Sequence, residues 1–153
     1  MDQKQVAYIA GYLDAKGTFS IRKPQHTLLL SPSISITEGN KGMIEHLQGL
    51  LGGTIVPSKP KPRKKPIYQI WWGGRKAIAI ACLLKPHLIL KREQAEILST
   101  FKLGNGTEEG MRQKVKQYIH IATLNKQKEI KHLRKVKRHG ETFIELDGVL
   151  FQL

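Results

Sequence analysis

A short segment near the N-terminus constrains the fold more than any other part of this chain. It begins with a mostly apolar stretch in which Ala7, Ala10 and Gly11 recur at spacings that place small side chains along one helical face. Gly17 predicts the end of that helix, and residues 18–22 then alternate polar with apolar side chains, as a half-buried strand does. The segment therefore predicts a helix that can approach another helix closely and that leads directly into a strand.

The composition favours a basic, single-domain protein. The chain has 153 residues, enough for one sizeable core, and a net charge of +14. Solubility alone needs a charge of about 2 to 8 in a small domain, so the excess favours a polyanionic partner, above all nucleic acid. Cys82 is the only cysteine and lies in an apolar run, so we expect a buried, inert thiol. Since no apolar stretch reaches about 20 residues and no secretory leader opens the chain, we expect a soluble intracellular protein without a membrane partner. With nucleic acid as the expected partner, no small-molecule substrate is expected.

The remaining pattern predicts an α+β fold. After the first helix and strand we expect strand 28–37, helix 41–51, strands 54–56 and 67–72, and helices 75–84, 92–101 and 110–124. This αββαββα order predicts an antiparallel sheet with helices on one face. We expect residues 1–125 to form this domain. Residues 126–153 would add a basic segment and a C-terminal hairpin-like extension that turns at Asp147-Gly148.

One face of the predicted sheet is polar. Residues 28–37 place apolar side chains on one side and hydroxyl side chains on the other. Such a face suits hydrogen bonds to base edges and phosphates, although a solvated sheet shows the same alternation. Residues 57–66 form a basic, proline-punctuated linker that we expect to contact phosphates, with an idle solvated loop as the alternative. In residues 67–72 the alternation predicts that one of Trp71 and Trp72 faces the core.

Residues 9–17, Ile-Ala-Gly-Tyr-Leu-Asp-Ala-Lys-Gly, resemble the nine-residue signature of the LAGLIDADG homing endonucleases, and seven of the nine are identical or conservative. Residues 84–95 and 121–125 resemble later helical segments of that family, and the order of elements agrees from residue 6 to about 125. The resemblance implies a saddle-shaped sheet over a long double-stranded DNA site. A single signature in the chain implies a homodimer and a pseudo-palindromic target.

The resemblance also implies an assignment of contact residues. The dimer interface would lie on the first helix, at Ala7, Ala10, Gly11 and Asp14. The DNA-binding residues would be the polar and cationic side chains on the outer sheet face and in its loops: Ser20, Arg22, Lys23, Ser31, Ser33, Ser35, Ser58, Lys59, Lys61, Arg63, Lys64, Lys65, Gln69 and Trp71.

The eighth position of the signature departs from the family. In active members the resemblance implies an acid there that binds a divalent metal, usually Mg2+, for phosphodiester hydrolysis. This chain has Lys16, and a protonated lysine has no lone pair for Mg2+ and repels it. We therefore expect Mg2+ to bind weakly or not at all. Asp14, at the sixth position, is expected to give capping or polar support.

Three further residues are implied near the reacting phosphate. Lys91 would stabilise developing negative charge, with a solvated helix start as its alternative role, and Glu38 and Lys41 would supply a polar and a basic group. If a metal does bind, Glu38 or the backbone carbonyl of Ala15 would hold it.

The favoured hypothesis is a sequence-specific, double-stranded DNA-binding homodimer with the endonuclease fold and with cleavage lost or impaired by Lys16. One alternative is an active, metal-dependent homing endonuclease that cuts a long pseudo-palindromic site. Another is an RNA-binding splicing cofactor of the intron-maturase type, and a basic scaffold protein is disfavoured by the charge and the polar sheet face together.

Overall fold

The computed structural model describes residues 1–24, 29–58, 65–104, 106–126 and 133–152. The elements follow in the order α1 (Gln3–Lys16), β1 (Thr18–Arg22), β2 (Ser31–Glu38), α2 (Lys41–Leu51), β3 (Thr54–Ser58), β4 (Ile67–Gly73), α3 (Gly74–Leu84), the short 3-10 helix η1 (Lys85–His87), α4 (Arg92–Ser99), α5 (Glu108–Leu124), β5 (Leu133–Arg138), β6 (Glu141–Leu146) and β7 (Val149–Gln152). The predicted αββαββα order is confirmed.

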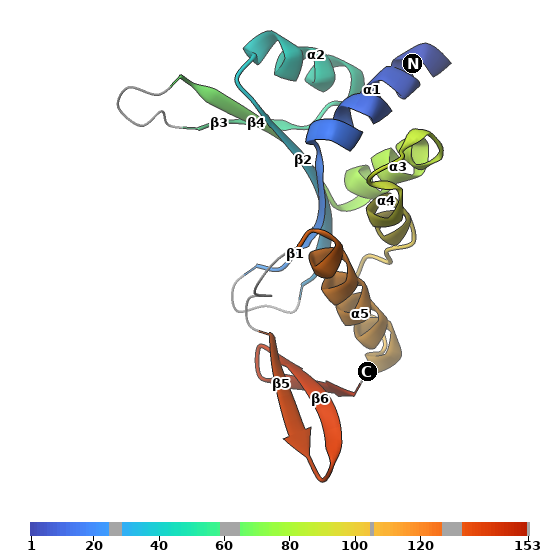
Figure 1. The fold of residues 1–153 in the computed structure, drawn as a ribbon, viewed down its shortest axis with the longest axis vertical. Coiled ribbons are helices and arrows are strands. Elements are labelled where there is room, and N and C mark those ends of the chain that lie inside the picture. The colour runs from blue at the N-terminus through green and yellow to red at the C-terminus, as the bar shows by residue number, and fades with distance from the viewer. Residues whose placement is uncertain (25–28, 59–64, 105, 127–132, 153) are drawn as a thin grey trace.

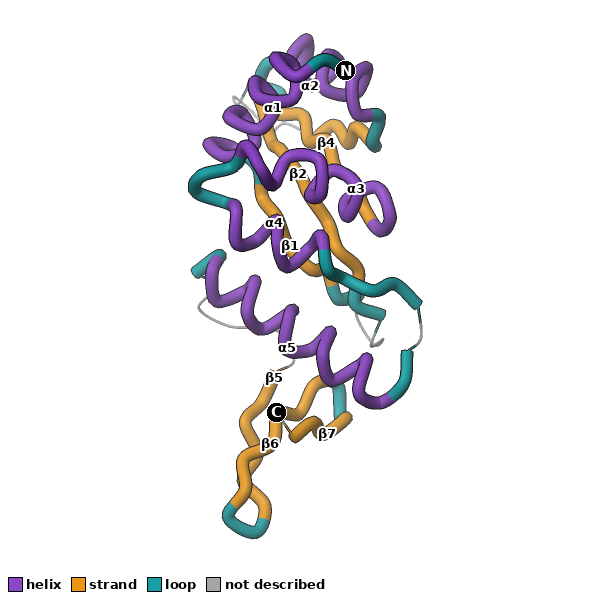
Figure 2. The backbone as a smooth tube through the Cα atoms, turned by 90° about the vertical axis from the view of Figure 1, so that its right-hand side faces the viewer, coloured by secondary structure: helices purple, strands orange, loops and turns teal. Residues whose placement is uncertain are grey.

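The first four strands form one antiparallel sheet in the spatial order β1-β2-β4-β3. Its helices cover one face, and the opposite face is open, as Figures 1 and 2 show from two directions. The covered face carries the core side chains, and Phe19, Ile34, Ile70 and Trp72 are all buried. Of the two tryptophans, Trp72 faces the core and Trp71 faces outward, so the predicted alternation along β4 is confirmed.

Helix α1 ends where its sequence predicts, but for a different physical reason. Gly17 has an extended backbone, with φ of −73°, and so does not use the left-handed conformation that glycine often supplies after a helix. Its backbone passes so close to Leu13 that an added Cβ would lie 2.6 Å from the Leu13 carbonyl oxygen. A glycine is therefore required at this position by close packing, which lets the chain turn at once into β1.

Several boundaries differ from the prediction by a few residues. Strand β2 begins at Ser31, three residues later than expected. Helix α4 ends at Ser99, because Thr100 leaves the helical conformation with φ of −95° and ψ of 0° and the Phe101 N–H bonds the Leu98 carbonyl, three residues back. Helix α5 begins at Glu108, where the Thr107 hydroxyl accepts the Gly110 N–H and caps the first turn.

The expectation for Cys82 is wrong, because its side chain is exposed. Cys82 lies on the side of α3 opposite the buried Ala77, Ala81 and Leu84. Among the residues that the structure describes, no helix combines the length and the apolar character needed to cross a membrane.

The C-terminal residues form a second, three-stranded antiparallel sheet in the order β5-β6-β7. The predicted hairpin is confirmed, since Asp147 and Gly148 have φ of 50° and 81° and close a tight turn between β6 and β7. Leu146 and Phe151 are buried in the same hydrophobic cluster as Tyr118 of α5. The Lys23 ammonium also pairs with the Asp147 carboxylate, so this sheet is joined to the end of β1.

Candidate functional site

The open face of the four-stranded sheet is polar and carries no acid. Along β1 to β4, Glu38 is the one acidic residue, and it shares the covered side of β2 with Ile34 and Ile36. The register aligns the outward side chains in rows across the strands. These outward residues are Thr18, Ser20, Arg22, Ser31, Ser33, Ser35, Thr37, Thr54, Val56, Ile67, Gln69, Trp71 and Gly73. A polyanion lying on this face would meet hydroxyl, amide and guanidinium groups without electrostatic repulsion from a carboxylate.

Arg22 and Trp71 form a stacked pair on this face, with the guanidinium carbon 5.4 Å from the ring centroid. The Trp71 ring leans along β4 over Gly73, where an added Cβ would lie 2.7 Å from the ring. Gly73 is the register partner of Ser33, and Ser33 is 4% exposed. Ser33, predicted to contact DNA, is therefore buried, whereas Arg22 is held at the surface by an aromatic support.

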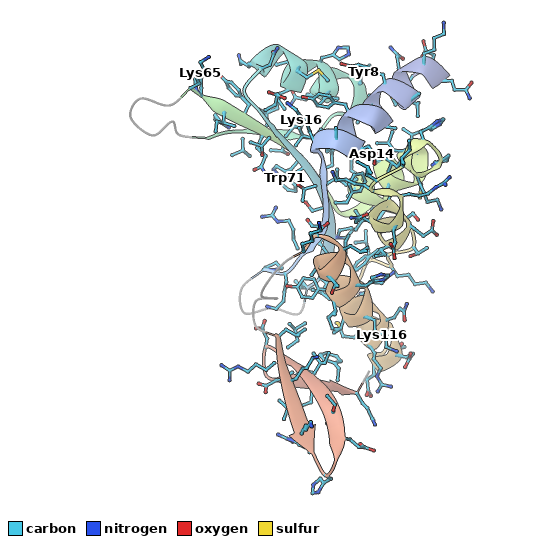
Figure 3. All side chains as sticks on the ribbon, viewed as in Figure 1. Tyr8, Asp14, Lys16, Lys65, Trp71 and Lys116 are labelled. Carbon is cyan, nitrogen blue, oxygen red and sulfur yellow. The ribbon has the colours of Figure 1, made fainter. Side chains whose placement is uncertain are left out.

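The other predicted DNA-binding residues divide into three groups. Ser20, Ser31, Ser35 and Gln69 lie on the outer face as expected, and Lys65 is exposed just before β4 (Figure 3). The Lys23 side chain is 2% exposed and is engaged by Asp147, so it is not available as a surface cation. The predictions for Lys59, Lys61, Arg63, Lys64 and the side chain of Ser58 fall outside the described residues.

The last turn of α1 carries an ion pair at the signature's eighth position. The Lys16 ammonium lies 2.5 Å from Glu38 Oε2, and the Tyr12 hydroxyl donates to the same oxygen at 2.7 Å. The other oxygen, Oε1, accepts the backbone N–H groups of Gly39 and Asn40 at 2.8 and 3.4 Å. Hydrogen bonds from Lys16 and Tyr12 lower the pKa of Glu38 to about 2. Burial and the neighbouring Glu38 carboxylate raise the pKa of Tyr12 to about 12.

Asp14 points to a different side of α1 and binds the loop that leads into α4. Asp14 Oδ2 accepts the N–H groups of Ile89 and Leu90, both at 2.9 Å, and Oδ1 accepts that of Lys91 at 2.8 Å. The Lys91 ammonium in turn donates to the Asp14 backbone oxygen at 2.8 Å. Burial alone would raise the pKa of Asp14, but the three N–H donors and the Lys91 charge outweigh it and lower that pKa. Asp14 thus gives the expected polar support, because its hydrogen bonds hold α1 against the loop that leads into α4 and so act as a clamp between the two helices.

An exposed stripe of mostly small residues runs along α1. Ala7, Gly11 and Ala15 are exposed beside the large, exposed Tyr8, and nothing lies within 4 Å of a Cβ added at Gly11. Ala10 is fully buried and faces the chain's own core, and Asp14 is buried as well. The four residues predicted to form the dimer interface therefore lie on two faces of α1: Ala7 and Gly11 on an exposed face, Ala10 and Asp14 on a buried one.

Comparison with solved structures identifies the fold. The homing endonuclease I-CvuI, solved in complex with its target, superposes with a TM-score of 0.65 at 22% identity over 84% of this chain and 85% of that one. The archaeal intron-encoded homing endonuclease I-Vdi141I, complexed with DNA, gives 0.65 at 21% identity over 86% and 90%. This chain has the LAGLIDADG homing endonuclease fold. The LAGLIDADG homing endonuclease I-SmaMI, bound to cleaved DNA, gives 0.53 at 16% identity over 87% of this chain and 51% of the larger protein. No protein-family model and no curated protein matches the sequence.

The LAGLIDADG fold implies a divalent metal at the end of α1, and the side chains found there do not fit one. Lys16 is cationic, and Glu38 uses both oxygens on the bonds described above. Asp14 uses both of its oxygens on backbone N–H groups. Within the described part of the chain, no group of three His, Cys, Asp or Glu side chains could hold a metal ion. A divalent cation would first have to displace the Lys16 ammonium.

The structure brings some of the predicted reactive residues together and separates others. Lys16 and Glu38 are in direct contact, and Lys91 is bound at the Asp14 carbonyl, one residue before Ala15. Lys41 is directed along its own helix, where its ammonium lies 3.0 Å from Glu45.

Sequence reasoning missed Tyr12 and the residue pair Ile89 and Leu90. Tyr12 lies one helical turn before Lys16, so the spacing of four could have indicated that both meet one partner. Ile89 and Leu90 are 84% and 75% exposed, and their apolar character alone wrongly favours the core.

Proposed function

We propose that this chain forms a homodimer that binds double-stranded DNA in a sequence-specific manner and that has lost, or nearly lost, the ability to cleave it. The observation that carries the proposal is the contact between Lys16 and Glu38 at 2.5 Å, beneath a sheet whose open face carries no acid. The Lys16–Glu38 contact opposes metal-dependent hydrolysis, and the acid-free sheet face suits DNA binding.

DNA binding is supported by charge and by the character of the sheet face. The net charge of +14 attracts a polyanion, and hydroxyl and amide groups can bond both phosphates and base edges. Arg22, supported by Trp71, presents the fork geometry that best recognises guanine in the major groove. Three solved structures with this fold contain DNA, which is consistent with the same use of the face here.

Homodimer formation is supported by two adjoining exposed features. The stripe of Ala7, Gly11 and Ala15 would let a second α1 approach closely, and Tyr8 would flank the contact. Ile89 and Leu90 project from a loop that Asp14 holds against the end of α1. An exposed apolar pair beside a small-residue helix face is typical of a surface that a partner covers.

Loss of cleavage is supported by the chemistry of the α1 terminus. A lysine in place of the acid removes a ligand and adds a positive charge, and Glu38 balances that charge. The Lys16 ammonium can instead donate hydrogen bonds to a DNA phosphate, so binding without a divalent cation is expected.

The experiment first selects a binding site from a random pool of DNA duplexes and then measures affinity by fluorescence anisotropy in EDTA and in Mg2+. We expect no gain of affinity from Mg2+, no cleavage in Mg2+, and a steep loss of affinity with added salt. Strand cleavage by the unaltered protein in Mg2+ would contradict the proposal and favour the active endonuclease. Tighter binding of structured RNA than of duplex DNA at matched salt would favour the splicing cofactor.

Substitution separates the role of the lysine from that of the fold. Lys16→Asp would place a new carboxylate beside Glu38, so we expect measurable Mn2+ binding by calorimetry and restored cleavage of the selected site. Lys16→Met removes the positive charge without adding a ligand and serves as the matched control, with neither metal binding nor cleavage. Absence of cleavage in Lys16→Asp despite Mn2+ binding would show that Lys16 is not what prevents the reaction.

A further inference from the structure

Strand β5 is a cationic edge. Four of its six residues are Arg134, Lys135, Lys137 and Arg138, all of them exposed, and no acid interrupts them. The strand lies at one edge of the C-terminal sheet and pairs with β6 on its other side. At about 3.3 Å per residue it spans about 20 Å, which corresponds to roughly six nucleotide steps along one DNA strand.

The four cations are not equivalent. Arg134 and Arg138 lie opposite Glu145 and Glu141 in the β5–β6 register, so acids share their face. Lys135 and Lys137 belong to the other face of the strand, where their register partners are Ile144 and Thr142. Cationic residues, lysine above all, also protect exposed sheet edges from unwanted pairing, and the DNA-binding test below separates that role from a phosphate contact. The two lysines therefore contribute net positive charge that β6 does not balance.

The C-terminal sheet is held at a defined place on the protomer. The buried Lys23 ammonium, directly after β1, pairs with Asp147 in the β6–β7 turn. Leu146 and Phe151 belong to the same buried hydrophobic cluster as Tyr118 of α5. The sheet lies beyond the end of the four-stranded sheet that is farther from α1, in both views (Figures 1 and 2). Within it, β5 occupies the edge on the side away from helices α1 to α4, which is the side of the open sheet face (Figure 1).

We propose that β5 binds the phosphate backbone of DNA outside the segment that the four-stranded sheet contacts. This inference rests on the proposed function, and it adds a second contact region to each protomer. If α1 lies at the dimer axis, the C-terminal sheets lie at the two outer ends of the complex. Their cations would then extend the DNA segment that the protein contacts by the same length at both ends, without adding base recognition.

The test compares two double variants that each remove two exposed lysine charges. Lys135→Gln with Lys137→Gln removes the unbalanced charge of β5. Lys102→Gln with Lys116→Gln is the matched control, because Lys102 precedes α5 and Lys116 lies on the side of α5 away from the C-terminal sheet (Figure 3). Circular dichroism melts establish that both variants fold like the parent.

The probe is the duplex selected by the parent protein, in a long form and in a form trimmed to its sequence-specific segment. We expect the β5 variant to bind the long form about tenfold more weakly and the trimmed form unchanged, and the hydroxyl-radical footprint to shorten at both ends. The slope of log K against log salt should shrink by up to about 3.6, since each lost phosphate contact removes about 0.9 and a dimer would lose four. The control variant should match the parent.

Two results would overturn the inference in distinguishable ways. A footprint and salt slope equal to those of the parent, with normal DNA binding, would exclude β5 as a contact and leave the proposed function intact. Failure of the parent itself to bind any duplex would overturn the proposed function and the β5 contact together.

Discussion

The Asp14 carboxylate joins α1 to the start of α4 through main-chain groups alone. Its two oxygens accept three N–H groups that precede the first turn of α4, where backbone donors have no partner inside the helix. The negative charge also lies at the positive end of the α4 dipole. A carboxylate is thus favoured here by geometry and by charge, independently of any catalytic role.

We expect Asp14→Asn to lower the free energy of unfolding by about 2–3 kcal/mol, because the amide nitrogen cannot accept a backbone N–H and the charge is lost. Urea titration at pH 7 measures this loss. The lowered pKa of Asp14 means that its contribution is complete above about 3.8, the ordinary pKa, and is lost as pH falls through the lower folded value. The difference between parent and variant should therefore shrink in acid.

Asp2→Asn provides the control for this prediction. Asp2 caps α1 through its hydrogen bond to the Gln5 N–H at 2.8 Å, but it is exposed, and asparagine caps about as well. We expect little change. An equal loss of stability in both variants would contradict the clamp role of Asp14.

The pKa of Glu38 provides a second test at the level of a single residue. We expect its pKa, measured by NMR titration of the side-chain carboxyl carbon, to be about 2 in the parent and to rise toward the ordinary 4.5 in Lys16→Met. Since the folded pKa is depressed, the stabilisation from Glu38 is present above about 4.5 and is lost as pH falls toward 2. An unchanged pKa in the variant would show that Lys16 is not the main cause.

Helix α1 shows what periodicity can and cannot assign. Three small residues at positions 7, 10 and 11 predict a face for close contact, but alanine is equally compatible with a buried and an exposed site. The larger apolar residues resolve the ambiguity, because Val6 and Leu13 lie on the side of Ala10 and are buried with it. A reading based on Val6, Ala10 and Leu13 would have separated the core face from the exposed stripe.

We expect Gly11→Ala to weaken the dimer by about tenfold or more, because an added methyl group would separate two closely packed helices. In the protomer the added Cβ meets nothing within 4 Å, so alanine should stabilise the isolated helix by up to about 1 kcal/mol. Sedimentation equilibrium measures the dimer constant, and thermal melts at low concentration measure the protomer.

Gly49→Ala is the matched control, since Gly49 is an exposed glycine in α2 whose added Cβ also meets nothing within 4 Å. It should stabilise the fold without changing the dimer constant. Identical association of both variants would place the dimer contact elsewhere.

The strands were predictable where one face is packed. In β2 and β4 the apolar side chains alternate because helices cover one face only, and their period of two is visible in the sequence. In β5 the apolar residues Leu133 and Val136 are three apart and the intervening positions are cationic, so no strand period exists. That strand is specified by pairing with β6, which local sequence does not encode.

The architecture as a whole follows from the order of its elements, but its long-range connections do not. Lys23 and Asp147 are 124 positions apart, and nothing in the sequence around either one indicates the other. The resemblance placed Lys23 among the DNA-binding residues, whereas the structure uses its charge to join the first strand to the last turn. A surface role and a buried ion pair are indistinguishable for a lysine seen in sequence alone.

We expect Lys23→Met to loosen the C-terminal sheet without unfolding the rest of the chain. Methionine retains the apolar stem but removes the charge that holds the β6–β7 turn. Amide hydrogen exchange, read by mass spectrometry, should become about tenfold faster in β6 and β7 and remain unchanged in β2 and β4. Uniform acceleration across both sheets would indicate that the two sheets unfold as one unit.

The loop before α4 keeps its shape through main-chain hydrogen bonds, so its two exposed side chains are free to change during evolution. Asp14 recognises the main chain at positions 89, 90 and 91, and every amino acid except proline supplies the N–H group it needs. Mutation can therefore exchange Ile89 and Leu90 for side chains of another size or polarity while the loop keeps its shape. Substitution of these two exposed side chains, in evolution or by design, would therefore change which partner the proposed dimer surface prefers without changing the loop that carries them.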